Sequence, residues 1–194
     1  MTEEEIYEMW DQYADLPKIL MDAGEDLERP GLIDTPERFG RMMKNELLVG
    51  YSILPEEVLS ASWEDEGGGV NVCRNITFTS LCEHHLMPFF GTVSLGYAPG
   101  GWVCGLSKLA RLVDCFARRL QIQERMTNQI ADAIAEHIHD PTDANEGKPK
   151  GVAVIVKATH LCCKGRGVKQ QWMEYETIAL RGDEANRVLR TLQC

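Results

Sequence analysis

The chain lacks any apolar run long enough to cross a membrane as a helix. Hydrophobic residues make up 44% of its 194 residues, but no stretch approaches the ~20 consecutive apolar residues that a bilayer requires. Internal repeats are also missing, and the one biased segment is a short acidic and glycine-rich stretch at residues 63–69. With a mean hydropathy of -0.25, these features indicate a soluble globular protein with room for one domain plus a helical extension.

Positive charge is scarce as well. The chain has 20 Lys and Arg against 30 Asp and Glu, so its formal net charge is -10. This balance argues against broad nucleic-acid binding through a basic surface. An anionic substrate would need basic residues gathered at one place.

Two features bear on cellular location. Residues 1–5 are mostly acidic, which is opposite to the basic start of a secretory or organellar leader. The seven cysteines are odd in number and lack the spacing of a disulfide framework, which favours a reducing compartment. We therefore expect a cytoplasmic protein.

Metal-binding side chains are concentrated in the stretch Leu81–Pro88. Cys82 and His85 are separated by two residues, so a thiolate and an imidazole can bind one metal ion, and this pair favours Zn²⁺ over Mg²⁺ or Ca²⁺. The sequence has no second pair of this form to close a four-ligand structural site. It does offer a third thiolate, in Cys162 or Cys163. Three protein ligands leave a position for water, as in a catalytic zinc site.

The alternative interpretation is that Cys82 is a small buried apolar side chain and that the histidines are ordinary surface or core residues. For an isolated Cys-x-x-His motif this alternative would be favoured. The remaining motifs of the chain weigh against it.

Hydrophobic periodicity predicts helices in the first part of the chain. Apolar residues recur at helical spacing in residues 3–21, where Pro17 is expected to break or kink the helix. A second helix is predicted from about residue 35 to Gly50, with Pro36 in its first turn. A short helix is predicted at residues 55–59.

After the glycine-rich stretch at residues 63–69 the period of the pattern changes from that of helices to that of strands. This stretch is the best candidate for a boundary, so we predict an N-terminal helical arm at residues 1–66 and a main domain at residues 67–194. The predicted order is two strands, two long central helices and two further strands, which indicates the α+β fold class, with both helices on one face of an antiparallel sheet. The strands are expected at residues 70–80, 89–97, 152–158 and 170–180, and the helices at 107–116, 122–138 and 183–192.

The first strand shows the alternation most clearly. Its apolar or small residues alternate with asparagines and threonines, which predicts one half-buried strand that ends at Cys82. The residues expected to alternate with polar ones are Val70, Val72, Ile76, Phe78 and Ser80.

Several polar residues are not explained by packing. Lys108 and Arg111 share a face at the start of the first central helix, where Ser107 can act as a cap and free backbone N–H groups suit a phosphate. Arg166, between two glycines, and Arg38, in a first helical turn, are further candidate cations. The alternative for Lys108, Arg111 and Arg38 is a solvated basic surface.

Glutamate at the start of the second central helix suggests a purine site. The carboxylate of Glu124 can accept two parallel hydrogen bonds from adjacent N–H donors, such as N1 and N2 of guanine. Taken alone, Glu124 is more often a first-turn helix glutamate. Arg118 and Arg119 could bind phosphate, but packed and partly solvated positions are favoured for them.

Taken together, these motifs resemble those of GTP cyclohydrolase I in order and spacing. The resemblance runs from about Thr35 to Gly167 and includes T-P-E-R at residues 35–38. The other matching motifs are C-E-H-H-L-M-P at 82–88, G-L-S-K-L-A-R at 105–111, R-L-Q-I-Q-E-R-M-T at 119–127 and A-T-H-L-C at 158–162. Beyond Gly167 the sequence follows the family pattern only loosely.

The resemblance implies the tunnelling fold, in which small α+β subunits join their sheets into a ring. Two pentameric rings stack into a homodecamer, and active sites are shared between neighbouring subunits. It also implies the conversion of GTP and water to 7,8-dihydroneopterin triphosphate and formate.

The same resemblance implies roles for individual residues. Cys82, His85 and Cys162 are similar to the zinc ligands, with Cys162 favoured over Cys163 by its spacing from His160. His84 resembles the proton donor beside the purine N7, and His160 the second acid/base histidine near the ribose. Guanine would be bound by Glu124 with help from Gln123, and the triphosphate by Ser107, Lys108, Arg111, Arg166 and Arg38.

Two rival interpretations stay open on the sequence alone. The first is a related tunnelling-fold enzyme that acts on another pterin or deazaguanine intermediate, against which the triphosphate cations and Glu124 argue. The second is a non-catalytic module in which zinc only stabilises a ring of subunits. A site with three ligands and two extra histidines argues against it.

Overall fold

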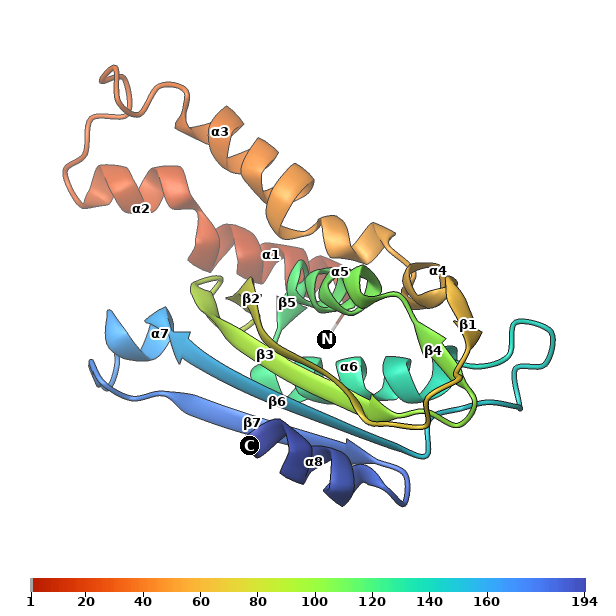
Figure 1. The fold of residues 1–194 in the computed structure, drawn as a ribbon. Coiled ribbons are helices and arrows are strands. Elements are labelled where there is room, and N and C mark those ends of the chain that lie inside the picture. Colours follow the sequence, from red (N-terminus) through yellow and green to blue (C-terminus); the bar gives the residue numbers. More distant parts are fainter. Residues whose placement is uncertain (1) are drawn as a thin grey trace. The chain divides into compact units, whose positions relative to one another are not determined.

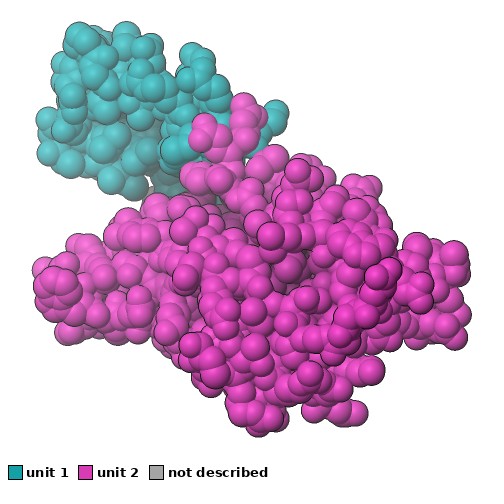
Figure 2. Space-filling model, viewed as in Figure 1, with its two compact units in different colours: residues 1–44 teal, residues 45–194 magenta. Residues whose placement is uncertain are grey.

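The structure is a computed structural model that describes residues 2–194, apart from the side chains of residues 12 and 13. Its contacts divide the chain into two compact units, residues 1–44 and residues 45–194, which Figure 2 shows in different colours. Residues 45–66 therefore group with the second unit. The predicted functional boundary after residue 66 stays a prediction.

The described residues of the first unit form three helices, α1 (Glu3–Ala14), α2 (Leu16–Asp22) and α3 (Thr35–Met42). The predicted break near Pro17 is confirmed, because Asp15 ends α1 and its side chain accepts a hydrogen bond from the Lys18 N–H at 3.1 Å to begin α2. Pro36 lies in the first turn of α3, where a missing N–H costs nothing.

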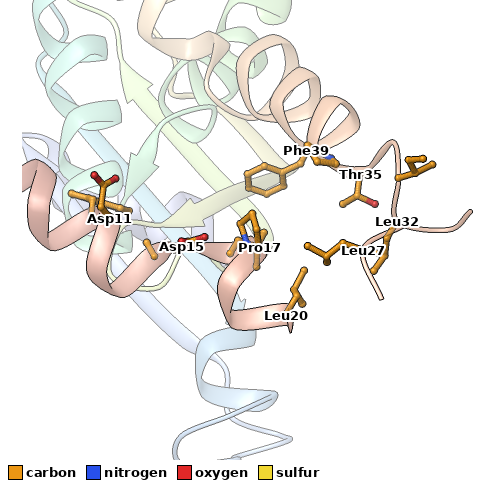
Figure 3. A pocket seen from close by; sticks show the side chains of 13 residues that line it. Asp11, Asp15, Pro17, Leu20, Leu27, Leu32, Thr35 and Phe39 are labelled. Atoms are coloured by element: carbon orange, nitrogen blue, oxygen red, sulfur yellow. The ribbon is translucent and has the colours of Figure 1, made fainter. Parts of the chain in front are cut away.

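Apolar side chains of the first unit line a hollow of about 730 Å³. In Figure 3, Leu20, Leu27, Leu32 and Phe39 lie around it, with Asp11 and Asp15 on the α1 side. Among residues 2–11 and 14–44, none is fully buried.

The second unit is built on a five-stranded sheet with the strand order β5-β2-β3-β6-β7. The three pairs β2–β3, β3–β6 and β6–β7 are antiparallel, and the short β5 runs parallel to the end of β2. The strands are β2 (Asn71–Cys82), β3 (Pro88–Ala98), β5 (Leu120–Gln121), β6 (Gly151–His160) and β7 (Tyr175–Arg181). A separate pair joins β1 (Ser62–Glu64) to β4 (Trp102–Cys104).

Helices cover both faces of this sheet (Figure 1). The helices α5 (Leu106–Ala117) and α6 (Gln123–His137) pack on one face, where the main core includes Val154 and Val156 of β6. The opposite face carries α8 (Ala185–Gln193), whose Val188 packs with Ala153 and Ile155. Because β6 is covered on both sides, its sequence is apolar almost without interruption. The remaining elements are a π-helical turn (Met43–Leu47), a 3₁₀ turn (Val49–Ser52), α4 (Pro55–Leu59) and α7 (Leu161–Lys164).

The predicted alternation in the first strand is interrupted by a β-bulge. The β2–β3 register shifts between Cys73 and Ile76, and Asn75 has a positive φ of 58°. As a result Val72 packs on the α8 face, whereas Ile76 and Phe78 pack on the α5–α6 face. The bulge adds one residue, so the two halves of the strand present opposite phases.

The α+β prediction is confirmed, with both long helices on one face of a mainly antiparallel sheet. Three local expectations were wrong. The helix predicted from about residue 35 to Gly50 ends at Met42, and a π-helical turn and a 3₁₀ turn follow it. Ser107 does not cap α5, because that helix begins after Gly105 without a side-chain cap. The last strand starts at Tyr175 rather than at residue 170. No helix in the described part of the chain is long and apolar enough to span a membrane.

Gly91 provides a test of the packing between β3 and β6. It lies opposite Ala158, and an added Cβ would overlap the backbone carbonyl of Lys157. We expect Gly91→Ala to lower the free energy of unfolding by roughly 1–3 kcal/mol, because the two strands must separate locally. Urea unfolding of the full chain measures this change.

Gly69→Ala is the matched control. A Cβ there meets nothing within 4 Å, so its unfolding midpoint should stay close to that of the wild type. Equal midpoints for the two variants would contradict the tight approach of β3 and β6.

Candidate functional site

A tight turn between β2 and β3 carries the first two candidate metal ligands. The N–H of Cys82 donates to the Met87 carbonyl at 2.9 Å, and the N–H groups of His85 and Leu86 donate to the Cys82 carbonyl at 3.3 and 2.8 Å. Leu86 has a φ of 52°, a left-handed conformation that a bulky residue adopts only when its surroundings enforce it. The turn thus reverses the chain and places His85 beside the end of β2.

The third candidate ligand arrives through the antiparallel pairing of β3 with β6. Phe89, just after the turn, lies opposite His160 at the end of β6, and α7 begins at the next residue and places Cys162. The Cys82 Sγ lies 3.7 Å from the His85 Nδ1, and one ligand atom from each of Cys82, His85 and Cys162 lies within 4.8 Å of the others.

This group fits a zinc ion. Tetrahedral zinc with bond lengths of about 2.0–2.3 Å separates its ligand atoms by roughly 3.5–3.8 Å, so small side-chain movements suffice. Burial and the neighbouring sulfurs of Cys82 and Cys163 raise the pKa of the Cys162 thiol to about 11. Two buried sulfurs side by side resist becoming thiolates by themselves, and a divalent cation between them removes that cost. The group includes Cys162 and not Cys163.

The adjacent histidine has a different environment. The ring centroids of His84 and His85 are 6.2 Å apart and their planes are inclined by 72°. His84 is exposed, and its Nδ1 lies 3.9 Å from the Cys82 Sγ. It therefore lies beside the metal group with its ring accessible to a ligand.

The second histidine of interest, His160, is held on several sides. Its ring stacks on Phe89 with centroids 4.5 Å apart and an interplanar angle of 3°, and its Nε2 lies 2.8 Å from the Gln123 Oε1. Burial lowers its pKa, an effect that the charge of Glu124 opposes. The neutral imidazole is therefore favoured.

Helix α6 contributes three consecutive side chains to this end of the sheet. Gln123 is 1% exposed and its amide is fully engaged inside the protein. Glu124 is exposed and accepts a hydrogen bond from the Tyr175 hydroxyl at 3.0 Å. Arg125 donates to both carboxylate oxygens of Glu83 at 2.6 and 2.8 Å, which ties α6 to the metal turn and lowers the pKa of Glu83.

Three predicted phosphate ligands lie away from this group. Ser107, Lys108 and Arg111 are at the start of α5 beside β4, whereas the end of α5 leads into β5, which pairs with Cys82 (Figure 1). With 1.5 Å of rise per residue, Lys108 is more than about 10 Å along the helix from that end. Neither Lys108 nor Arg111 forms an ion pair with any residue that the structure describes.

The other predicted cations lie in different environments. Arg166 is exposed, shortly after Cys162. Arg38 belongs to the first unit, where its guanidinium contacts Asp34 at 3.3 Å and the Gly31 carbonyl at 3.2 Å. Arg119 donates to the carbonyls of Gly50, Cys115 and Ile53, which agrees with the packed position favoured for it.

Sequence reasoning missed three supporting residues, namely Tyr175, Phe89 and Arg125. Each acts through a partner distant in sequence, so its role cannot be inferred from local spacing, although Arg125 lies within the matching motif at residues 119–127. Tyr175 lies opposite Ala158 in the pairing of β6 with β7, which the structure shows and the sequence does not.

An open group of two thiols and an imidazole, with two more histidines beside it, is the arrangement of a zinc-dependent hydrolase. Comparison with known proteins defines the family. The GTP cyclohydrolase I family model matches residues 13–192. GTP cyclohydrolase 1 of Wolinella succinogenes is 48% identical over 160 residues, covering 82% of this chain and 80% of the relative. GTP cyclohydrolase 1 of Clostridium kluyveri is 42% identical over 175 residues, covering 90% and 89%. The chain belongs to the GTP cyclohydrolase I family.

A solved structure is also similar to the chain. The apo crystal structure of the archaeosine synthase QueF-Like has 18% sequence identity and a TM-score of 0.45, and the match covers 61% of this chain and 98% of that chain.

The neighbouring cysteines provide a test of the metal group. We expect purified wild-type protein and Cys163→Ala to carry about one zinc ion per chain, and Cys162→Ala to lose zinc on dialysis, because only Cys162 completes the three-ligand group. Elemental analysis after dialysis measures the content. Zinc retained in Cys162→Ala but lost in Cys163→Ala would assign the ligand to the other thiol.

Proposed function

We propose that this chain carries out the GTP cyclohydrolase I activity of its family through the residues gathered at the β2–β3 turn. The reaction opens the imidazole ring of guanine in GTP by hydrolysis, releases formate and rearranges the remainder to 7,8-dihydroneopterin triphosphate. The observation that carries the proposal is the group of Cys82, His85 and Cys162 with His84 and His160 beside it.

Cys82, His85 and Cys162 would hold the zinc ion, and together they leave a position for water or substrate. When bound, zinc supplies a Lewis acid that lowers the pKa of water to about 7. The burial of both cysteines supports this role, since it keeps bulk water from competing for the thiolates.

His84 would donate a proton to the purine N7, which makes carbon 8 a better acceptor for water. Its exposure beside the metal group and the capacity of an imidazole both to donate and to accept a proton support this role. His160 would act as the second acid/base group, near the ribose. Its stacking on Phe89 supports a fixed position for proton transfer.

Glu124 would recognise guanine through the N1 and N2 donors. The hydrogen bond from Tyr175 fixes one carboxylate oxygen, while Oε2 has no hydrogen-bond partner among the residues that the structure describes. We modify the expectation for Gln123: its buried amide contacts His160 and the β6–β7 backbone, so we assign its side chain to His160 and not to guanine.

Ser107, Lys108, Arg111, Arg166 and Arg38 would bind the triphosphate. The distance of the α5 start from the metal turn supports a site shared between chains, in which one subunit supplies zinc and guanine ligands and a neighbour supplies phosphate ligands. Binding both ends of GTP would hold the reacting ring in place.

We further propose that the chain assembles as a homodecamer of two stacked pentameric rings. The open outer edge of β7 supports this, since within the described residues it pairs only with β6, and exposed strand edges recruit other strands. Residues 67–194 would form the ring-building catalytic domain, with residues 1–66 as the helical arm. We place the protein in the cytoplasm.

Incubation of the zinc-loaded full chain with GTP tests the activity. Formate should be released together with a pterin that becomes fluorescent after oxidation. Intact GTP at saturating zinc would support instead the rival interpretation of a zinc-stapled ring without catalysis.

Replacing His84 separates metal binding from proton donation. We expect His84→Ala to keep zinc and to lower kcat by ~10²- to 10⁴-fold, the usual contribution of a positioned general acid. Steady-state kinetics and elemental analysis are measured on one preparation. Loss of zinc together with activity would make His84 a ligand.

Mixing inactive variants tests the shared site. Cys82→Ser removes a metal ligand, and the double variant Lys108→Ala/Arg111→Ala removes phosphate ligands. If the two halves come from different chains, random co-assembly should restore about a quarter of the wild-type activity. Co-expression of both variants and a GTP turnover assay measure this recovery.

The control pairs Cys82→Ser with His85→Ala, which damage the same half and should not complement. No recovery from the first pair, despite assembly of both variants, would mean that one chain supplies the whole site.

A further inference from the structure

The side-chain amide of Gln123 is fixed by a closed set of hydrogen bonds. Its Nε2 lies 3.0 Å from the Val156 carbonyl, 3.0 Å from the Tyr175 carbonyl and 3.1 Å from the Thr177 Oγ1. Gln123 is 1% exposed. Buried amides cannot exchange these partners for water, so the orientation of the amide is determined by β6 and β7.

The neighbouring threonines agree with this orientation. The Thr127 hydroxyl donates to the Gln123 backbone carbonyl at 2.7 Å, so its oxygen is left to accept from Thr177 at 2.6 Å. Thr177 in turn accepts from the Gln123 amide. A flipped amide would point its oxygen at two carbonyls and break this cycle.

The orientation of Gln123 determines which nitrogen of His160 carries hydrogen. With Nε2 of Gln123 facing the strands, its Oε1 faces the His160 Nε2 at 2.8 Å. An amide oxygen only accepts hydrogen bonds, so the His160 Nε2 must be the donor. In neutral imidazole the other nitrogen, Nδ1, then keeps its lone pair. Nδ1 has no hydrogen-bond partner in the described part of the chain.

Stacking fixes the remaining freedom of the ring. The His160 ring lies parallel to Phe89 at 4.5 Å, and Tyr175 approaches its edge with centroids 6.3 Å apart. A ring flip would point carbon instead of N–H at the Gln123 oxygen and leave that buried acceptor without a donor.

We propose that Gln123 is a positioning residue that holds His160 in the tautomer with hydrogen on Nε2, so that Nδ1 is the nitrogen that exchanges protons with the substrate. This inference rests on the proposed function, in which His160 is an acid/base group. A substrate O–H or C–H proton moves to the Nδ1 lone pair, and the bonding electrons stay on the substrate. The resulting imidazolium keeps its Nε2–H bond to Gln123, and Nδ1 later returns the proton.

The first test observes the tautomer directly. Solid-state ¹⁵N NMR of histidine-labelled, zinc-loaded full chain distinguishes protonated from unprotonated ring nitrogens, and the chain has only five histidines. The signals of His160 are assigned by their loss in His160→Gln. We expect hydrogen on Nε2 in the wild type and a mixture of tautomers in Gln123→Met.

Gln121→Met is the matched control. Gln121 is also 1% exposed, and its amide donates to the Phe116 carbonyl and the Gln129 side chain without contacting His160. It should lose comparable stability but keep the wild-type tautomer. Hydrogen on Nε2 in all three proteins, or on Nδ1 in the wild type, would overturn the inference.

The second test uses kinetics. Gln123→Met should lower kcat for GTP at least about tenfold with little change in KM or zinc content. Gln123→Glu should recover part of kcat, because a buried, protonated carboxyl can donate to one strand carbonyl and accept from His160. Equal kcat in wild type and Gln123→Met would overturn the positioning role. If wild-type protein turns over no GTP, the proposed function fails, while the tautomer result still decides the Gln123 assignment.

Discussion

The pairing of β3 with both β2 and β6 is the constraint on which the site depends. Cys82 and Cys162 are 80 positions apart in the chain, yet β2 and β6 both end beside the start of β3. The two thiols therefore meet without any long loop to order. The turn that starts β3 adds His85, and the ladder opposite Phe89 adds His160. The three candidate zinc ligands and His160, the proposed acid/base residue, thus depend on one set of backbone hydrogen bonds.

The residues of the site fall into a buried group and an exposed group. The two cysteines and Gln123 are buried. Buried thiolates are stabilised only by a nearby cation, and a buried amide only when its N–H and C=O groups are hydrogen-bonded. His84, His85 and Glu124 are exposed, where a substrate can reach them. The two thiol ligands and the hydrogen bonds of Gln123 thus lie in the interior, while the third ligand, His85, and the proposed proton donor His84 lie on the solvent side of the β2–β3 turn.

Much of this could be predicted from the sequence because it follows from local spacing. The Cys82–His85 spacing indicated a metal pair, and the change from helical to strand periodicity indicated the α+β fold. The bulge at Asn75 could not be predicted from the sequence, because the extra residue leaves the apolar pattern unchanged. It nevertheless moves the apolar side chains after it to the opposite face of the sheet. The hydrogen bonds of Gln123 could not be predicted either, because its partners lie on β6 and β7, more than 30 positions away. A side-chain cap was predicted at Ser107, but α5 begins without one.

The first turn of α6 has a consequence of its own. Three successive residues there point to three different partners: Gln123 to His160, Glu124 to Tyr175, and Arg125 to Glu83 on the metal turn. A helix cannot slide or rotate for one of these contacts without disturbing the other two. Sequence changes in the packing beneath α6, for example at Met126 or Ile130, would then disturb the contacts to His160, to Tyr175 and to the turn that carries Cys82 and His85 together. The evolutionary freedom of that helix is therefore narrower than its own apolar pattern suggests.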